Sequence, residues 1–209
     1  MLLCHEMFSS LQGEGPHTGR PAFFIRLSGC LEPFCPWCDT KDAWFGGSPA
    51  SIEDIIQKVV RESHRFVVIT GGEPFLQWDD GLSRLDRELA EMKIEVQYET
   101  SGKVAIPQQV RGEVICSPKY LSGKWHLARE SMYRADAFKF VACRESIFFI
   151  DAFIAEHGID RDRVWLMPKG KTRKEQTELL QFLWEHCVKK GYRLSARLHI
   201  LCFDQKKGV

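Results

Sequence analysis

Short runs of apolar residues alternate with longer amphipathic stretches along most of the 209-residue chain. The short runs are rich in β-branched and aromatic residues, as buried strands are. We expect strands over residues 3–8, 22–29, 66–70, 94–99, 114–119, 137–141, 163–167 and 193–200. Apolar residues at helical spacing predict helices over residues 51–63, 78–92, 146–157 and 172–190.

Polar residues mark where two of these helices begin. Ser51 is the expected N-cap of the first helix, with Glu53 and Asp54 in its first turn. Thr172 is the expected N-cap of the last helix, which runs to about Lys190. These signals support the helix boundaries that the apolar spacing predicts.

The repeated alternation of strands and helices predicts βαβ units around a parallel sheet, the α/β class. The chain is short for eight such units, so we expect a partial, open (βα)6-type TIM-like barrel in a single domain over residues 1–209. Segments 100–113 and 117–136 lack helical periodicity, which predicts trimmed helices there. Polar motifs follow the strands, where barrels and open α/β sheets bind ligands.

The charge balance excludes some partners. The chain has 29 basic and 28 acidic side chains, a formal charge of +1, which argues against strong electrostatic affinity for nucleic acid or membranes. No apolar run is long enough to span a bilayer. The first residues lack the basic and apolar regions of a signal peptide. We therefore expect a cytoplasmic protein that binds neither nucleic acid nor membranes directly.

Three of the eight cysteines lie close together: Cys30, Cys35 and Cys38 fall within nine positions. The other five are scattered in apolar company, which fits a reduced compartment. A structural zinc site takes four ligands. Three thiolates on a four-iron cluster instead leave one iron open to a small molecule.

Two other kinds of chemistry remain open for these thiols. A zinc-binding module could use the three cysteines with His17, but it leaves the polar motif 70–74 without a role. A thiol oxidoreductase could use the Cys-x-x-Cys spacing of Cys35 and Cys38, but it leaves Cys30 without a role.

Polar features at other predicted strand ends have both a structural and a functional interpretation. Segment 12–16 contains two glycines and a proline, typical of a surface turn or of a loop that approaches a ligand closely. Arg26 lies in an apolar strand and needs a partner, either a structural carboxylate or the carboxylate of a substrate. Segment 71–74 is either a βα turn or a ligand loop. Glu99 is either a capping residue or a hydrogen-bond acceptor for a ligand.

Together these motifs resemble those of radical S-adenosylmethionine (SAM) enzymes. The cysteine loop closed by Cys38-Asp39-Thr40 and the motif Thr-Gly-Gly-Glu-Pro at 70–74 carry the resemblance. Segments 7–15 and 19–22, with Arg26, narrow it to the family of 7-carboxy-7-deazaguanine synthases, and it extends over nearly the whole chain. The cysteines here are separated by four and then two residues, where three and then two are common in the family.

The resemblance implies three cofactors and a substrate site. Cys30, Cys35 and Cys38 would hold a 4Fe-4S cluster, and Thr40 would bind magnesium. The implied SAM contacts are Trp37, Cys38, Asp39, Gly71, Gly72, Glu73, Ser117, Pro118, Lys119, Met167, Pro168, Lys169 and Gly170, with Met167 standing where the family often has glutamine. The implied substrate contacts are Leu11, Gln12, Gly13, Glu14, Arg26, Thr70, Glu99 and His199. The alternative for His199 is a hydrogen-bonded structural role.

The resemblance also implies the reaction. An electron from the cluster would cleave SAM to methionine and a 5′-deoxyadenosyl radical, which takes hydrogen from C6 of 6-carboxy-5,6,7,8-tetrahydropterin. The ring would contract to 7-carboxy-7-deazaguanine with loss of ammonia, and SAM would be regenerated. The implied partners are an electron donor such as flavodoxin or ferredoxin and a second copy of the chain in a homodimer. The implied pathway is queuosine or 7-deazapurine biosynthesis for tRNA modification. A different radical SAM enzyme, such as a glycyl-radical activase, is the alternative.

Overall fold

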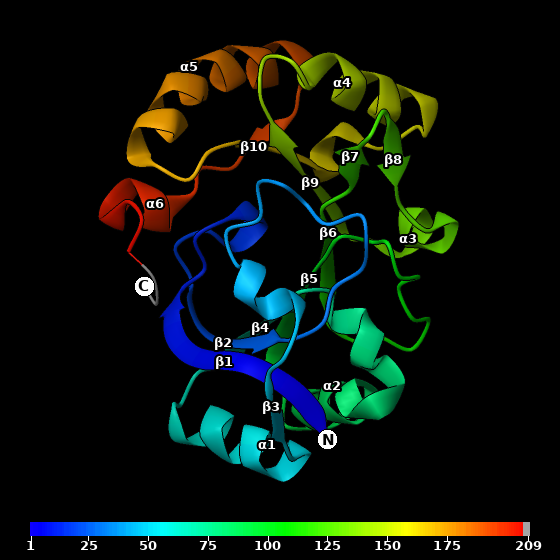
Figure 1. Ribbon diagram of the computed structural model, residues 1–209, viewed down its shortest axis with the longest axis vertical. Helices are drawn as coiled ribbons and strands as arrows, with labels where there is room; N and C mark the ends of the chain where they lie inside the picture. Colours follow the sequence, from blue (N-terminus) through cyan, green and yellow to red (C-terminus); the bar gives the residue numbers. More distant parts are fainter. Residues whose placement is uncertain (207–209) are drawn as a thin grey trace. The chain divides into compact units, whose positions relative to one another are not determined.

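The computed structural model describes residues 1–206, which divide into two compact units (Figure 1). The first unit combines Met1–Ser10 with Pro21–Asp136, and the second combines Leu11–Arg20 with the chain from Ala137 onwards. Each unit contains strands and helices in alternation, as the sequence pattern predicts for the α/β class. None of the helices in residues 1–206 has the length and apolar composition needed to cross a bilayer.

The first unit is built on an open sheet with the strand order β6-β5-β4-β2-β1-β3. Its strands are β1 Leu2–Leu11, β2 Pro21–Leu27, β3 Ser48–Ala50, β4 Phe66–Gly71, β5 Glu95–Thr100, β6 Glu113–Cys116 and the hairpin β7 Lys119–Leu121 with β8 Lys124–His126. Its helices are α1 Ile52–Arg61, α2 Ser83–Glu91 and α3 Arg129–Arg134, and its short helical turns are η2 Lys41–Trp44, η3 Pro74–Gln77 and η4 Trp78–Leu82.

Four neighbouring strands of this unit run parallel, namely β2, β4, β5 and β6. Their registers pair Arg26 with Thr70 and Thr100 with Cys116. Because the strands are parallel, their C-terminal ends meet at one edge of the sheet. The loops after these strands therefore start from the same edge.

Apolar side chains cover both faces of β2. On one face, the rings of Phe8 and Phe24 stack with centroids 5.1 Å apart, against buried Phe66 and Val68. On the other face, Ile25 and Leu27 are fully buried. A parallel strand buried on both faces reads as a continuous apolar run, which is why this segment was recognisable from its sequence.

The second unit contains three parallel strands in the order β11-β10-β9. Its elements are η1 Gly15–His17, β9 Ala137–Ala142, α4 Ile147–Glu156, η5 Arg161–Arg163, β10 Val164–Pro168, α5 Arg173–Lys190, β11 Arg193–Leu194 and α6 Leu198–Phe203. Helices α4 and α5 lie side by side (Figure 1), and Asp151 of α4 is within 3.1 Å of His186 of α5.

The helix starts predicted from capping residues are confirmed. The Ser51 hydroxyl accepts a hydrogen bond from the Asp54 backbone N–H at 3.0 Å, so α1 begins as expected. Thr172 and Glu175 form a reciprocal capping box at the start of α5. The helix predicted over 78–92 begins instead as the turn η4, and α2 starts at Ser83.

The strand predicted over 193–200 is wrong beyond its first two residues. Strand β11 ends at Leu194, and the apolar run that starts at Leu198 forms the helix α6. A short apolar run does not distinguish a buried strand from a buried helix. Here the Leu198 backbone N–H donates to the Gly13 carbonyl, and Arg197 is buried, so the chain turns before it reaches a strand's length.

Candidate functional site

In the first unit, the predicted site residues gather at the C-terminal ends of the parallel strands. The cysteine loop follows β2, the Gly-Gly-Glu-Pro motif ends β4, and Glu99 lies near the end of β5. Ser117 follows β6, and its backbone N–H donates to the Thr100 carbonyl at 2.7 Å. The topology thus brings together motifs that are up to about ninety positions apart along the chain, at the edge where α/β sheets bind ligands.

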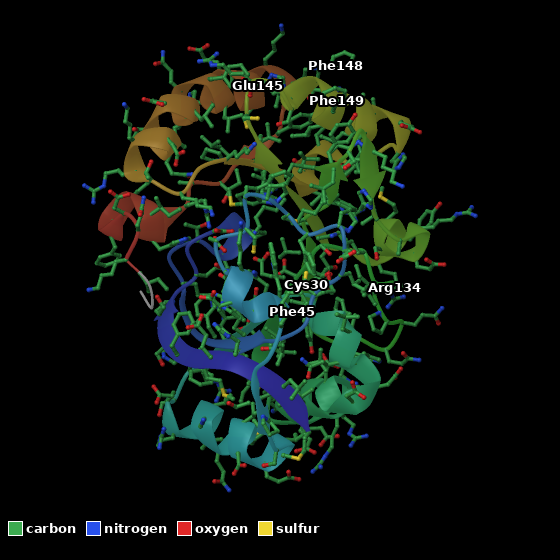
Figure 2. All side chains as sticks on the ribbon, in the orientation of Figure 1. Cys30, Phe45, Arg134, Glu145, Phe148 and Phe149 are labelled. Carbon is green, nitrogen blue, oxygen red and sulfur yellow. The ribbon has the colours of Figure 1, made fainter. Side chains whose placement is uncertain are left out.

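The cysteine loop carries three cysteines that form no disulfide bond, all of them partly accessible to solvent. The Cys38 backbone N–H donates to the Cys35 carbonyl at 3.0 Å, which turns the chain between these two cysteines. The ring of Phe34 stacks on Trp44 with centroids 4.4 Å apart and fixes the middle of the loop. Figure 2 labels Cys30 at the start of the loop and Phe45, whose ring meets that of Phe34 edge-on.

The cysteine loop is fastened to the Gly-Gly-Glu motif by backbone contacts. The Glu73 N–H donates to the Gly29 carbonyl at 2.7 Å, and the Gly72 N–H donates to the Leu27 carbonyl at 3.1 Å. A Cβ atom on Gly72 would lie 1.9 Å from the Gly29 carbonyl oxygen. Position 72 therefore admits only glycine while the two loops keep this distance.

Glu73 connects the end of β4 to the end of β5. Its carboxylate accepts hydrogen bonds from the Thr100 hydroxyl at 2.6 Å and from the backbone N–H and hydroxyl of Ser101. The side chain is fully buried, and burial raises its pKa, although these hydrogen bonds act in the opposite direction. The bonds of Glu73 fix the relative positions of two of the loops at this edge.

The donor set of the cysteine loop, three thiols, fits an iron–sulfur cluster. In a four-iron cluster, each of three thiolates binds a separate iron. Among residues 1–206, no group of three or more histidine, cysteine or acidic side chains is placed to hold one metal ion. Burial raises the pKa of the Cys30 thiol, and the Lys103 ammonium lowers it. Cys30 and Cys35 are close enough for the charge of one to affect the pKa of the other.

Arg26 forms an ion pair with a carboxylate of the protein, one of the two kinds of partner expected for it. Its Nε donates to Glu6 at 2.7 Å, and its side chain is 20% exposed. This bond uses one of five N–H donors on the guanidinium group. Its neighbour in the parallel register is Thr70, the residue directly before the Gly-Gly-Glu motif.

Other predicted residues of this unit make hydrogen bonds to near neighbours in the sequence. Glu99 accepts a hydrogen bond from Nε2 of the fully buried Gln97 at 2.7 Å, and Lys119 donates to the Ser117 hydroxyl at 2.7 Å. The Thr40 hydroxyl donates to Asp39 at 3.0 Å. Gln97 was not predicted as a site residue. Its placement on the same side of β5 as Glu99 follows from the two-residue period of a strand.

In the second unit, Glu14 is held by two buried cations. Lys139 Nζ lies 2.9 Å and Arg197 Nε 2.8 Å from its carboxylate, and His199 Nε2 lies 4.0 Å away. Burial works against ionisation of Glu14, but the two cations and His199 hold its pKa well below the ordinary value. Glu14 and His199 were predicted as site residues, whereas Lys139 and Arg197 were missed. The signal for Lys139 is a charged residue inside the apolar run 137–141, the signal by which Arg26 was found.

The loop before Glu14 fits closely against α6. A Cβ atom on Gly13 would lie 2.2 Å from Nδ1 of His199, so glycine is required for this approach. The Gln12 side chain accepts a hydrogen bond from the Glu14 N–H at 3.2 Å and is buried. Leu11 is 47% exposed. Gln12, Gly13, Glu14 and His199 thus lie together, as residues of one site would.

The segment 167–170, at the C-terminal end of β10, is also ordered by side chains that the sequence did not indicate. Gln176 donates through Nε2 to the carbonyls of Pro168 and Gly170, each at 3.0 Å. Arg197 donates to the Gly170 carbonyl at 2.9 Å. These bonds fix the backbone of the segment. Through Arg197, they also join it to Glu14 of the same unit.

Comparisons with known proteins identify the family. No family model matches the sequence. The chain is 37% identical to the 7-carboxy-7-deazaguanine synthase of Pyrobaculum aerophilum, over 97% of this chain and 95% of that protein. It is 36% identical to the synthase of Hyperthermus butylicus, over 94% and 90% of the two chains, and 32% identical to that of Escherichia coli, over 93% and 95%.

Solved structures agree with these relatives. The crystal structure of QueE from Escherichia coli superposes with a TM-score of 0.79 at 30% identity and covers 95% of this chain and 94% of that one. Streptococcus suis SuiB bound to its precursor peptide SuiA matches with a TM-score of 0.56 at 16% identity, over 83% and 47% of the chains, which is a likeness of fold alone. These matches confirm the predicted open α/β fold of the radical SAM type. The chain belongs to the 7-carboxy-7-deazaguanine synthase family.

Proposed function

We propose that the chain is a radical SAM lyase that converts 6-carboxy-5,6,7,8-tetrahydropterin to 7-carboxy-7-deazaguanine with loss of ammonia. The observation that carries the proposal is the three-thiol loop fastened to the Gly-Gly-Glu motif through Gly29 and Gly72. Its support is the family membership, which implies a 4Fe-4S cluster and SAM. When bound, these cofactors supply the one-electron chemistry that starts the rearrangement. The protein supplies binding, orientation and exclusion of water.

The proposed cofactor contacts follow from the motifs. Cys30, Cys35 and Cys38 would each bind one iron and leave the fourth iron for SAM. Backbone groups of Gly71 and Gly72 lie next to this loop and would contact SAM. The remaining SAM contacts are proposed at Trp37, Cys38, Asp39, Glu73, Ser117, Pro118, Lys119, Met167, Pro168, Lys169 and Gly170. We assign magnesium to Thr40, whose hydroxyl is a hard oxygen ligand.

The proposed substrate contacts follow from the motifs that resemble those of the family. The Arg26 guanidinium would pair with the substrate carboxylate, and Glu99 would accept hydrogen bonds from ring N–H groups. Glu14 would act mainly by fixing His199 and the Gln12-Gly13 loop, through its contacts with Arg197 and His199. The full proposed set is Leu11, Gln12, Gly13, Glu14, Arg26, Thr70, Glu99 and His199.

The setting of the reaction is also a proposal. We infer one radical SAM domain over residues 1–209, a cytoplasmic location and a homodimer. The family's place in queuosine biosynthesis supports a product that feeds tRNA modification. An electron donor such as flavodoxin or ferredoxin would reduce the cluster.

Anaerobic turnover tests this function. The protein would be reconstituted with iron and sulfide and supplied with SAM, magnesium, reductant and the carboxytetrahydropterin, and the deazaguanine acid would be detected by mass. We expect product from the wild type and from Cys202→Ala, whose cysteine is exposed on α6, and none from Cys35→Ala. SAM cleavage without product would support another radical SAM reaction and overturn the pterin assignment.

A further inference from the structure

Lys103 reaches from the loop after β5 to the cysteine loop. Its ammonium nitrogen lies 2.7 Å from the Pro33 carbonyl oxygen and 3.2 Å from that of Leu31. Both carbonyls belong to the four residues that separate Cys30 from Cys35. One cation therefore holds the longer of the two spacers between the thiols at two points.

The base of Lys103 is itself held in place. Its backbone N–H donates to the Ser101 hydroxyl at 3.3 Å, and Ser101 donates to the buried carboxylate of Glu73. The end of β5 joins the same network, because the Gly102 N–H donates to the Thr100 hydroxyl at 2.9 Å. Lys103 is thus aimed at the cysteine loop from a rigid base, whereas a surface lysine usually moves freely.

The placement of this charge has an electrostatic consequence for a bound cluster. Three thiolates make the cluster site negative, and reduction adds a further negative charge. A cation held nearby favours the reduced form over the oxidised form, because it interacts more strongly with the more negative state.

We propose that Lys103 is a positioning residue that clamps the Cys30–Cys35 segment and raises the reduction potential of the cluster bound there. The inference rests on the proposed function, because it requires the cluster. It assigns to Lys103 a role in the electron-transfer step, in addition to those of the three cysteines and of SAM.

The test compares reduction potentials of reconstituted protein, without substrate, by following the electron paramagnetic resonance signal during a reductive titration. Lys103→Met removes the charge and the donors, Lys103→Gln removes the charge but keeps an N–H donor, and Lys103→Arg keeps both. Lys124→Met, at an exposed position of β8, is the matched control. We expect the ratio of reduced to oxidised cluster at the wild-type midpoint to fall about tenfold in the Met and Gln variants, as for the loss of one nearby charge. Lys103→Arg and Lys124→Met should titrate as the wild type does.

Two results would overturn the inference and are distinguishable. If the wild type binds a cluster and Lys103→Gln titrates at the wild-type potential, the role of Lys103 is wrong while the proposed function stands. The proposed role of Lys103 would be wrong even if Lys103→Met lost iron faster than the wild type, because faster iron loss alone shows only a packing role. If the wild type binds no cluster, the proposed function and this inference both fail.

Discussion

At the scale of single residues, Glu14 shows how a half-buried charge is tolerated. Its carboxylate lies between Lys139 and Arg197, whose side chains are 4% and 9% exposed. A buried ion pair adds little by itself, but removing one partner leaves the others without compensation. The arrangement therefore makes the second unit sensitive to changes at position 14.

We predict that Glu14→Gln lowers the free energy of unfolding at pH 7 by roughly 3 kcal/mol, since it removes the negative charge that faces two buried cations. The folded-state pKa of Glu14 lies well below its unfolded value. Its stabilisation is therefore complete above the unfolded pKa and is lost as the pH falls from about 4.5 through the folded pKa. Urea denaturation of wild type and variant between pH 7 and pH 3 should show a difference that narrows as the pH falls. Glu178→Gln, at an exposed site on α5, should change stability by less than about 0.5 kcal/mol.

Gly72 shows a different constraint, the close approach of two loops. We predict that Gly72→Ala destabilises the protein by about 3 kcal/mol or more and reduces cluster incorporation, because its methyl group would overlap the Gly29 carbonyl. Gly123→Ala is the control: that glycine has open space around it and a φ of +79°, so its cost should be about 1–2 kcal/mol. Equal iron content and stability in the two variants would show that the contact between the loops is unimportant.

Residues with an exceptional local pattern are recognisable in the sequence, whereas residues defined by distant partners are not. Arg26 was recognisable as a charge within an apolar strand, and Gly72 as part of a motif. The alternative partner of Arg26, Glu6, is twenty positions away, and Arg197 meets Glu14 across 183 positions. Such pairings depend on the folded topology, so no local pattern indicates them.

At the scale of elements, most helices and strands were predictable because their patterns are regular and their starts are capped. Helix α5 has both signals, and its capping box is complete. The failure at 193–200 came from a short apolar run whose conformation depends on tertiary contacts at Gly13 and Arg197. The segment 117–136, which lacks helical periodicity, forms the hairpin β7–β8 and the six-residue helix α3.

We predict that Thr172→Ala lowers the stability by about 1 kcal/mol, because it removes the side chain that accepts from the Glu175 N–H. Thermal or urea unfolding followed by circular dichroism at the helix wavelength measures the change. The control is Thr177→Ala in the interior of α5, where alanine is the better helix former, so stability should stay equal or rise. A loss at position 177 as large as at position 172 would show that the cap has no special role.

At the scale of the whole molecule, the alternation of strands and helices was enough to predict an open, mostly parallel α/β fold. The relationship to the deazaguanine synthases confirms that prediction over 95% of the chain. The division into two compact units was not predictable, because the first-unit strand β1 leads directly into residues 11–20, which pack with the C-terminal part. The sequence shows no linker between these segments.

Cluster binding by the three cysteines is tested by the iron and sulfide content of anaerobically reconstituted protein, and by the electron paramagnetic resonance spectrum of the reduced cluster before and after SAM is added. We expect about four irons and four sulfides per chain for wild type and Cys202→Ala, a spectrum that SAM changes, and loss of the cluster in Cys35→Ala. Zinc in place of iron, or a cluster whose spectrum SAM leaves unchanged, would contradict the claim that three thiolates hold a cluster with one open iron.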